Sequence, residues 1–159
     1  MNLIIGNLNL TGRLGDVMKE SAHAALSYAR AHADTFGIDP KMFTDYDLHL
    51  HAPAGAVPKD GPSAGVTMLS SILSALTQRP ISPEYAMTGE INLHGNVMPI
   101  GGVKEKILAA RRNKIPRVIL PAQNKKDMQE CENMADDIEI IWVEHADEVL
   151  NRVLLSQNE

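Results

Sequence analysis

The sequence predicts a single domain of the α/β (α+β) class, built from a sheet and helices packed in layers. Its 159 residues, 44% of them hydrophobic and 22% charged, are typical of one globular domain that buries its own core. Short apolar runs alternate along the chain with segments whose apolar residues recur at helical spacing. No internal repeat, low-complexity tract or linker interrupts this alternation. We therefore expect residues 1–159 to form one unit.

In the first half of the chain, glycine and proline mark the ends of the expected elements. Gly37 and Pro40 stop a helix, and Pro53 ends a strand because proline lacks a backbone donor. Further glycines and prolines make 53–62 an irregular loop. The expected elements are an extended segment over 3–11, a helix over 16–35, a strand over 47–52 and a small, apolar, central helix over 63–76.

The second half continues the alternation. A strand over 85–93 is interrupted at Gly89, and Gly95-Asn96 is expected to form a two-residue turn that returns the chain along 97–100. The remaining expected elements are a helix over 101–112, a strand over 117–120, a helix over 125–134, a strand over 138–143 and a last helix over 146–155.

Charge and cysteine content exclude several classes of protein. A formal net charge of −5 argues against a nucleic-acid binder that works by neutralising phosphates. Cys131 is the only cysteine, so an internal disulfide and a thiolate zinc cluster are excluded, and a reducing, cytoplasmic compartment is expected. The sequence shows neither an apolar run long enough to cross a membrane nor the layout of a signal peptide.

The most informative segment is 58–65, in which a glycine- and proline-rich loop delivers Ser63 to the first turn of a helix. Two interpretations stay open on this segment alone. One is an N-cap, in which the Ser63 hydroxyl accepts a hydrogen bond from a backbone N–H. The other is a nucleophile, because free N–H groups and the positive end of a helix dipole can stabilise an oxyanion there.

A serine nucleophile needs a base to take its proton, and histidine is the common choice. His49 and His51 share one face of the expected strand with Asp47, because side chains alternate along a strand. This pattern also suggests a second hypothesis, a metal-dependent hydrolase that binds its metal through the same three residues, although no further ligand at a fixed spacing follows.

Lysine is the other candidate base, because burial lowers the pKa of a lysine and a neutral amine can accept the serine proton. Lys104 and Lys106 both lie in the first turns of the helix expected over 101–112. On a helical wheel, Lys106 lies closer to the apolar stripe of that helix. This placement favours Lys106 only slightly, and both lysines stay open.

Three stretches together resemble the proteolytic domain of the Lon family of ATP-dependent proteases: PKDGPSAG over 58–65, MTGEI over 87–91 and PIGGVKEK over 99–106. Weaker similarity runs from LTGRLGDVMKES at 10–21 to the carboxyl end and covers nearly the whole chain. A serine, a lysine and the intervening TGE signature in the register of the family pattern make a specific match.

The resemblance implies roles for the candidate site residues. Ser63 is then the nucleophile and Lys106 the general base of a Ser–Lys dyad that works through an acyl-enzyme. Thr88 matches a family threonine that hydrogen-bonds near the lysine and helps to orient it. Asp60 matches a loop acid that is linked in the family to switching between open and blocked sites.

The resemblance also implies a serine endopeptidase that degrades unfolded or damaged polypeptides, in a hexameric ring. His49 and His51 match a strand beside the site and are expected to support the chemistry. No cofactor or metal is expected in this chain, because ATP and Mg serve an ATPase module that lies upstream in the family and is not encoded here. The family domain begins with strand material that this chain largely lacks, so we expect a fragment or a truncated stand-alone relative.

The main alternative function is a non-catalytic scaffold. Lon-like folds without the dyad serve in DNA-repair and competence proteins as ring-assembly domains, whereas this chain has both dyad residues at the required spacing. We expect no membrane and no nucleic acid as partners of this domain. The metal-dependent hydrolase is the third and weakest function.

Overall fold

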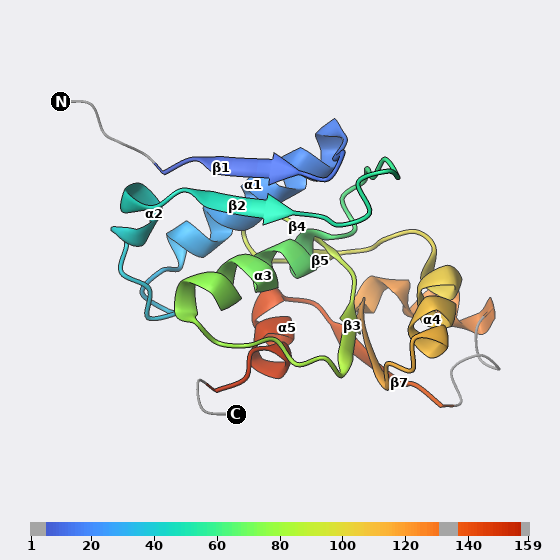
Figure 1. Ribbon diagram of the computed structural model, residues 1–159. Helices are drawn as coiled ribbons and strands as arrows, with labels where there is room; N and C mark the ends of the chain where they lie inside the picture. The colour runs from blue at the N-terminus through green and yellow to red at the C-terminus, as the bar shows by residue number, and fades with distance from the viewer. Residues whose placement is uncertain (1–5, 131–136, 157–159) are drawn as a thin grey trace.

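The computed structural model describes residues 6–130 and 137–156 and confirms the α/β class. Helices and short strands alternate along the chain (Figure 1). In chain order the elements are β1 (Leu8–Thr11), α1 (Asp16–Ala31), α2 (Met42–Asp45), β2 (Leu48–His51), α3 (Gly65–Thr77), β3 (Tyr85–Met87), β4 (Glu90–Ile91), β5 (Val97–Met98), α4 (Val103–Arg112), β6 (Arg117–Pro121), the 3₁₀ helix η1 (Ala122–Glu130), β7 (Glu139–Val143) and α5 (Ala146–Val153).

The described strands form three small sheets. β1 and β2 pair in parallel, with Leu8 opposite Leu48 and Thr11 opposite His51. β3, β6 and β7 form a parallel sheet in that order, so β6 is its central strand. β4 and β5 form an antiparallel pair. Parallel strands need crossover connections, which here are supplied by helices.

Helix α3 lies at the centre of the larger core, as expected from its apolar sequence. Val66, Leu69 and Leu73 on this helix are buried, and α1 packs against α3 along its length. The facing residues of α1 are small and fully buried, so the two helices approach closely: Ala22, Ala25 and Ala29. Figure 1 shows α1 and α5 beside α3, with β1 and β2 above it.

The sheet β3–β6–β7 separates this core from a second, smaller one. Ile119 of β6 belongs to the core around α3, whereas its neighbours Val118 and Leu120 belong to the core under α4. Side chains alternate across a strand, so one short strand serves both cores. Helix α4 contributes Val103 and Ile107 to the smaller core. Helices α3 and α4 therefore cover opposite faces of the same sheet.

Most of the expected elements are confirmed within one to four residues at each end. The break at Gly89 is confirmed, since it separates β3 from β4. Residues 3–5 of the expected first strand lie outside the described residues. The expected helix over 125–134 is wrong in type, because 122–130 forms a 3₁₀ helix, and 131–136 lie outside the described residues.

The expected two-residue turn at Gly95-Asn96 is also wrong, although the hairpin itself is confirmed. Ile91 pairs with Val97, so the connection runs from Asn92 to Asn96. The Asn92 side chain accepts hydrogen bonds from the backbone N–H of His94 and of Asn96, both at 3.0 Å. This side-chain bonding closes a longer turn than the Gly-Asn pair indicates.

No helix in the described part of the chain is long and apolar enough to cross a membrane.

Tyr28 ties the N-terminal half of the chain to the last helix. It is 1% exposed, and its hydroxyl donates a hydrogen bond to Asp147 of α5 at 3.1 Å. Burial, reinforced by the Asp147 carboxylate, raises the pKa of Tyr28 to about 12. Gly95, with a φ of +84°, lies against the ring, and a Cβ there would come within 2.5 Å of a Tyr28 carbon.

We expect Tyr28→Phe to lower the free energy of unfolding at pH 7 by about 1 kcal/mol, because it removes a partly buried hydrogen bond to a charged group. The folded pKa of Tyr28 lies above the unfolded value of 10.0, so the stabilisation from Tyr28 is fully present below pH 10. It is lost as the pH rises toward 12, because the unfolded state then ionises Tyr28 more readily than the folded state does. Urea unfolding at pH 7 and across this alkaline range tests both points. Tyr46→Phe is the control, because Tyr46 is 63% exposed. An alkaline loss of stability equal in Tyr28→Phe and wild type would contradict the assignment.

Candidate functional site

Ser63, Thr88 and Lys106 line one cavity of about 320 Å³. Ser63 comes from the turn before α3, Thr88 follows β3, and Lys106 lies on α4. Helices α3 and α4 cover opposite faces of the sheet, so the cavity lies where both helices pass β3, the edge strand. The structure thus brings together three predicted site residues that lie on separate segments of the chain.

The backbone of Ser63 is held by the segment after β3. Its carbonyl oxygen accepts hydrogen bonds from the Gly89 N–H at 2.9 Å and from the Thr88 hydroxyl at 3.0 Å. The Val66 N–H in turn donates to the Gly89 carbonyl at 3.0 Å. This close approach requires glycine at two positions: a Cβ on Gly65 would come 2.9 Å from the Ile91 nitrogen, and one on Gly89 would come 2.6 Å from Val97.

The N-cap interpretation of Ser63 is wrong. The helix begins at Gly65, its N-cap residue is Ala64, and no side chain caps it. Ser63 lies one residue outside the capping position because its carbonyl is committed to Thr88 and Gly89. Among the described residues, the Ser63 hydroxyl has no hydrogen-bond partner, so it is available to a substrate or a base.

Lys106 lies half-buried at the cavity, whereas Lys104 is exposed and lines a different cavity beyond the start of α4. The Lys106 amine donates a hydrogen bond to the Gly101 carbonyl at 3.0 Å. Gly102, with a φ of +72°, gives the chain the left-handed turn that folds Gly101 back beneath the amine. Among the described residues no hydrogen bond joins this amine to the Ser63 hydroxyl, although both residues line the same cavity.

Thr88 is buried, with 6% of its surface exposed, and its hydroxyl binds the backbone of Ser63. Its backbone N–H donates to the Ile119 carbonyl at 3.2 Å, which fixes it to the central strand of the sheet. Thr88 therefore positions the chain at Ser63, and its hydroxyl bonds to that carbonyl rather than to the Lys106 amine.

Asp60 lies apart from this cavity and caps α1 from a distance of 42 residues in sequence. Its carboxylate accepts hydrogen bonds from the backbone N–H of Met18 at 2.9 Å and of Gly61 at 2.8 Å. These bonds, together with one from the Val17 N–H, lower the pKa of Asp60 below its ordinary value of 3.8. The helix has no cap of its own, since its N-cap residue is Gly15, where a Cβ would collide with the Asp60 carboxyl group.

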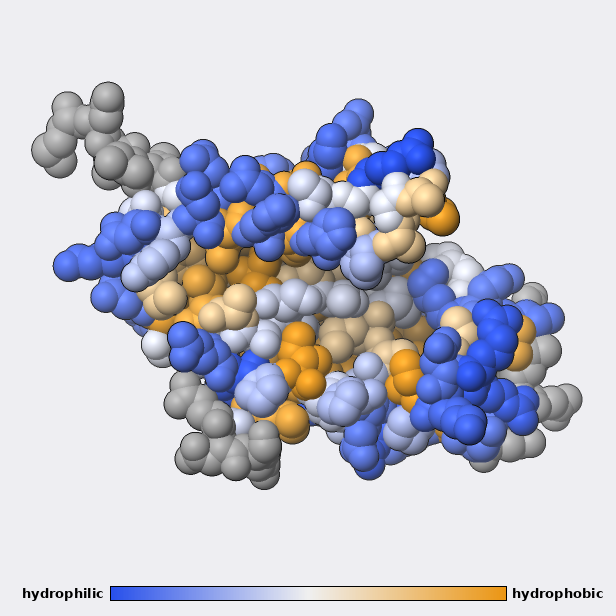
Figure 2. Space-filling view, viewed as in Figure 1, coloured by the Kyte–Doolittle hydropathy of each residue, from blue (hydrophilic) through white to orange (hydrophobic). Residues whose placement is uncertain are grey.

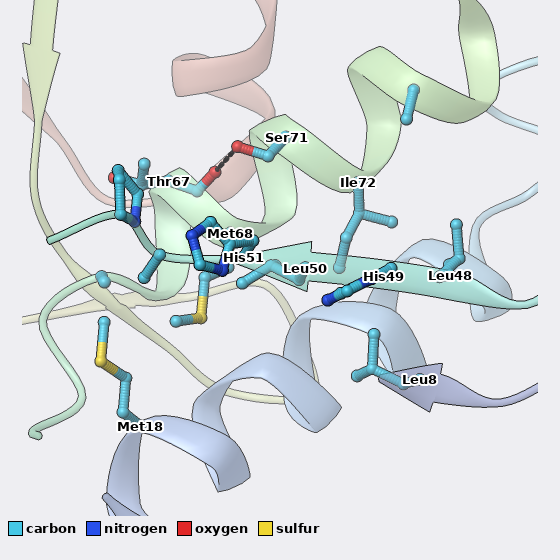
Figure 3. Close-up of a pocket in the computed structure, with 14 residues that line it drawn as sticks. Leu8, Met18, Leu48, His49, Leu50, His51, Thr67, Met68, Ser71 and Ile72 are labelled. Carbon is cyan, nitrogen blue, oxygen red and sulfur yellow. Dashed lines mark hydrogen bonds between the residues drawn. The ribbon is translucent and has the colours of Figure 1, made fainter. Parts of the chain in front are cut away.

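His49 and His51 line a second, larger cavity of about 460 Å³, between β2 and α3. Both rings bond to the Thr11 hydroxyl, through His49 Nε2 and His51 Nδ1, at 2.8 Å each. Figure 3 shows the strand and helix that wall this cavity, with apolar side chains from both. Hydrophobic residues gather in a hollow on this face of the molecule, below the polar rim of β1 and β2 (Figure 2).

The two cavities adjoin, because Ala64 and Thr67 line both. Nothing in the sequence distinguishes Thr67 from any other helical threonine, so its place between the cavities could not be predicted. Among the described residues, no three His, Cys, Asp or Glu side chains gather as a metal site would require. Asp47 instead accepts a hydrogen bond from the Asn7 N–H at 2.7 Å.

Comparison with known proteins gives a consistent result. A family model described as the Lon protease (S16) C-terminal proteolytic domain matches residues 2–156. The chain is 57% identical to Lon protease 1 of Thermus thermophilus over 146 residues, which is 91% of this chain and 18% of that protein. It is 56% identical to the Lon protease of Cytophaga hutchinsonii over 154 residues, covering 96% of this chain and 19% of that protein.

A third relative agrees with these two. The Lon protease of Clostridioides difficile is 52% identical over 155 residues, covering 97% of this chain and 20% of that protein. The chain therefore spans about a fifth of the length of these relatives.

We expect Asp60→Ala to lower the stability of the fold at pH 7, because it removes the cap of α1. Since the folded pKa of Asp60 lies below the unfolded value of 3.8, its contribution is present above that pH and is lost as the pH falls through the folded pKa. Urea unfolding from pH 7 downward should therefore show a smaller acid loss in Asp60→Ala than in wild type. Asp34→Ala, at an exposed position on the same half of the chain, is the control. An identical acid loss in wild type and Asp60→Ala would count against the cap.

Proposed function

This chain belongs to the family of Lon protease (S16) C-terminal proteolytic domains, and we propose that it is a serine endopeptidase domain that cuts unfolded or damaged polypeptides through Ser63 and Lys106. The observation that carries the proposal is the shared cavity. Ser63, in the turn before α3, and Lys106, on α4, reach it from opposite faces of one sheet. Of the two lysines that the sequence left open, only Lys106 lines this cavity.

In the proposed mechanism, Lys106 takes the proton of the Ser63 hydroxyl, and the oxygen attacks the scissile carbonyl carbon. The protonated amine then gives its proton to the leaving nitrogen. Water hydrolyses the acyl-enzyme in a second half-reaction that uses the same base. In the structure the Lys106 amine is bonded to the Gly101 carbonyl, so the mechanism requires the amine to leave that carbonyl and turn to the Ser63 hydroxyl when substrate binds, since catalytic hydrogen bonds often form only in the complex.

The oxyanion that forms in each half-reaction needs hydrogen-bond donors that are not already bonded to another acceptor. The backbone N–H groups of Ser63 and Ala64 have no acceptor among the described residues, and they lie at the N-terminal end of α3. The helix dipole adds positive potential at that place. We assign these two groups to the oxyanion.

The larger cavity supports a preference for apolar side chains next to the cut bond. Its walls are mostly apolar, and it opens beside Ser63 through Ala64 and Thr67. An unfolded polypeptide exposes such side chains, whereas a folded one buries them. His49 and His51 stand at the rim of this cavity, where we assign them a supporting role.

Assembly and setting are proposed by extension from the relatives, of which this chain spans about a fifth. We propose a hexameric ring in the cytoplasm, fed by the ATP-dependent module of the full-length protein. The alternative is a scaffold domain that forms the ring without cutting. Sizing chromatography beside a cleavage assay separates the two, because a ring that never cleaves, even when joined to the remainder of Thermus thermophilus Lon protease 1, favours the scaffold.

We expect Ser63→Ala and Lys106→Ala to fold and to lose at least about 1,000-fold in the rate of casein cleavage, because each removes one half of the dyad. The rate of the wild type should rise with pH, since only the unprotonated amine accepts the serine proton. A gel-based or fluorescent casein assay measures both.

Lys104→Ala is the matched control, because Lys104 lies two residues away on the same helix and faces elsewhere. It should cleave casein as the wild type does. Full turnover in either dyad variant would remove the mechanism, and cleavage that a strong chelator abolishes would favour a metal-dependent hydrolase instead.

A further inference from the structure

The ammonium group of Lys59 is enclosed by three backbone carbonyl groups. Its Nζ donates to the Gly12 oxygen at 3.1 Å, the Ala54 oxygen at 2.9 Å and the Val57 oxygen at 3.0 Å. Two of these carbonyls belong to the loop that precedes Ser63, and the third belongs to the turn between β1 and α1. The Lys59 side chain therefore links two residues of the loop to each other and links the loop to the neighbouring turn.

The loop has no apolar core that could order it. Residues 53–58 are all exposed, including Val57 at 59%. Apart from the bonds to Lys59, the described part of the chain shows two hydrogen bonds to residues 53–58. The Val57 N–H donates to the Ala54 carbonyl at 3.0 Å, and the Arg13 side chain donates to the Ala56 carbonyl at 3.1 Å. Ala54 holds a φ of +63°, which an L-residue adopts only when its surroundings impose it. The order of the loop thus depends on four hydrogen bonds, two of which are donated by the Lys59 amine.

The backbone of Lys59 is also hydrogen-bonded to the turn between β1 and α1, four residues before Ser63. Its N–H donates to the Arg13 carbonyl at 3.0 Å, and its own carbonyl accepts from the Gly15 N–H at 2.7 Å. Asp60, the next residue, caps α1, and Ser63 follows three residues later. A displacement at Lys59 is therefore passed along a short chain segment to the nucleophile, and a displacement of about 1 Å at a reacting group can cost on the order of 100-fold in rate.

We propose that Lys59 is a positioning residue for Ser63: its ammonium group, held by three carbonyls, sets the loop that places the serine and walls the apolar cavity. The expected effect of Lys59 on the reaction rate rests on the proposed function. The expected effect of Lys59 on the order of the loop does not rest on it. The loop joins the cavity wall directly, because Ala52 and Pro53 line the larger cavity.

The chemistry of the site requires lysine in particular. An ammonium group offers three donors around one nitrogen, which matches three carbonyls that converge on a point. A guanidinium group presents its donors in a flat fork and cannot direct three of them at those oxygens. Charge alone would not replace Lys59, so Lys59→Arg should behave like a loss of the residue.

The first test compares Lys59→Met with Lys19→Met in the full chain. Lys19 is exposed on the first turns of α1, and its side chain has no partner among the described residues. We expect amide hydrogen exchange at Val57 and Lys59, whose N–H groups donate to the Ala54 and Arg13 carbonyls, to become at least about tenfold faster in Lys59→Met and to stay unchanged in Lys19→Met. Unchanged exchange in Lys59→Met would overturn the proposal, whatever happens to activity.

The second test is chemical rescue of the truncated residue. Lys59→Ala should lower kcat/KM for a peptide substrate between about 10- and 100-fold while the shape of the pH–rate profile stays that of the wild type, because Lys106 is untouched. Added propylammonium chloride, which matches the atoms that the substitution removes, should restore a part of the lost rate that saturates with concentration, and tetramethylammonium, which has no N–H donor, should not. Equal effects of the two salts, or a kcat/KM that Lys59→Ala leaves unchanged, would overturn the positioning role.

The two proposals fail separately. If Ser63→Ala keeps full activity, the dyad is wrong, yet the exchange result at Val57 and Lys59 still decides whether Lys59 orders the loop. Ser63→Ala should itself leave that exchange unchanged, because the Ser63 hydroxyl has no partner among the described residues.

Discussion

The close approach of α3 to the segment after β3 is the constraint on which the site depends. Three hydrogen bonds make it: two onto the Ser63 carbonyl, from Gly89 and Thr88, and one from Val66 onto the Gly89 carbonyl. It is possible only with glycine at positions 65 and 89, where any Cβ would press on the facing chain. These bonds fix the backbone of Ser63 and leave its hydroxyl free, which is the arrangement a nucleophile needs.

The sheet β3–β6–β7 converts that local contact into a two-sided site. Its central strand sends Ile119 into the core around α3 and Val118 and Leu120 into the core under α4. Each helix is thereby held to its own face by a separate hydrophobic cluster, and the two meet only beyond the edge strand. Ser63 and Lys106 are brought to one cavity by packing on opposite faces, so neither residue needs the other in order to be placed.

The sequence predicts the part of this structure that local patterns encode. Apolar periodicity and the positions of glycine and proline locate the helices and strands, because those signals act within a few residues. The resemblance to the Lon family predicts Ser63 and Lys106 as the dyad, and the helical wheel correctly prefers Lys106 to Lys104 for burial. The errors concern bonds between distant residues. Ser63 is not an N-cap because residues 88 and 89 hold its carbonyl, and Asp60 caps a helix that begins 44 residues before it.

The most direct test of the account is covalent trapping of the serine. A fluorophosphonate bonds only to a hydroxyl that a neighbouring base has activated, and peptide mass spectrometry locates the adduct. The account predicts one adduct, on the peptide that contains Ser63, formed in wild type and Lys104→Ala but absent in Lys106→Ala. Labelling of Ser63 that proceeds equally well without Lys106, or a reactive serine elsewhere in the chain, would contradict it.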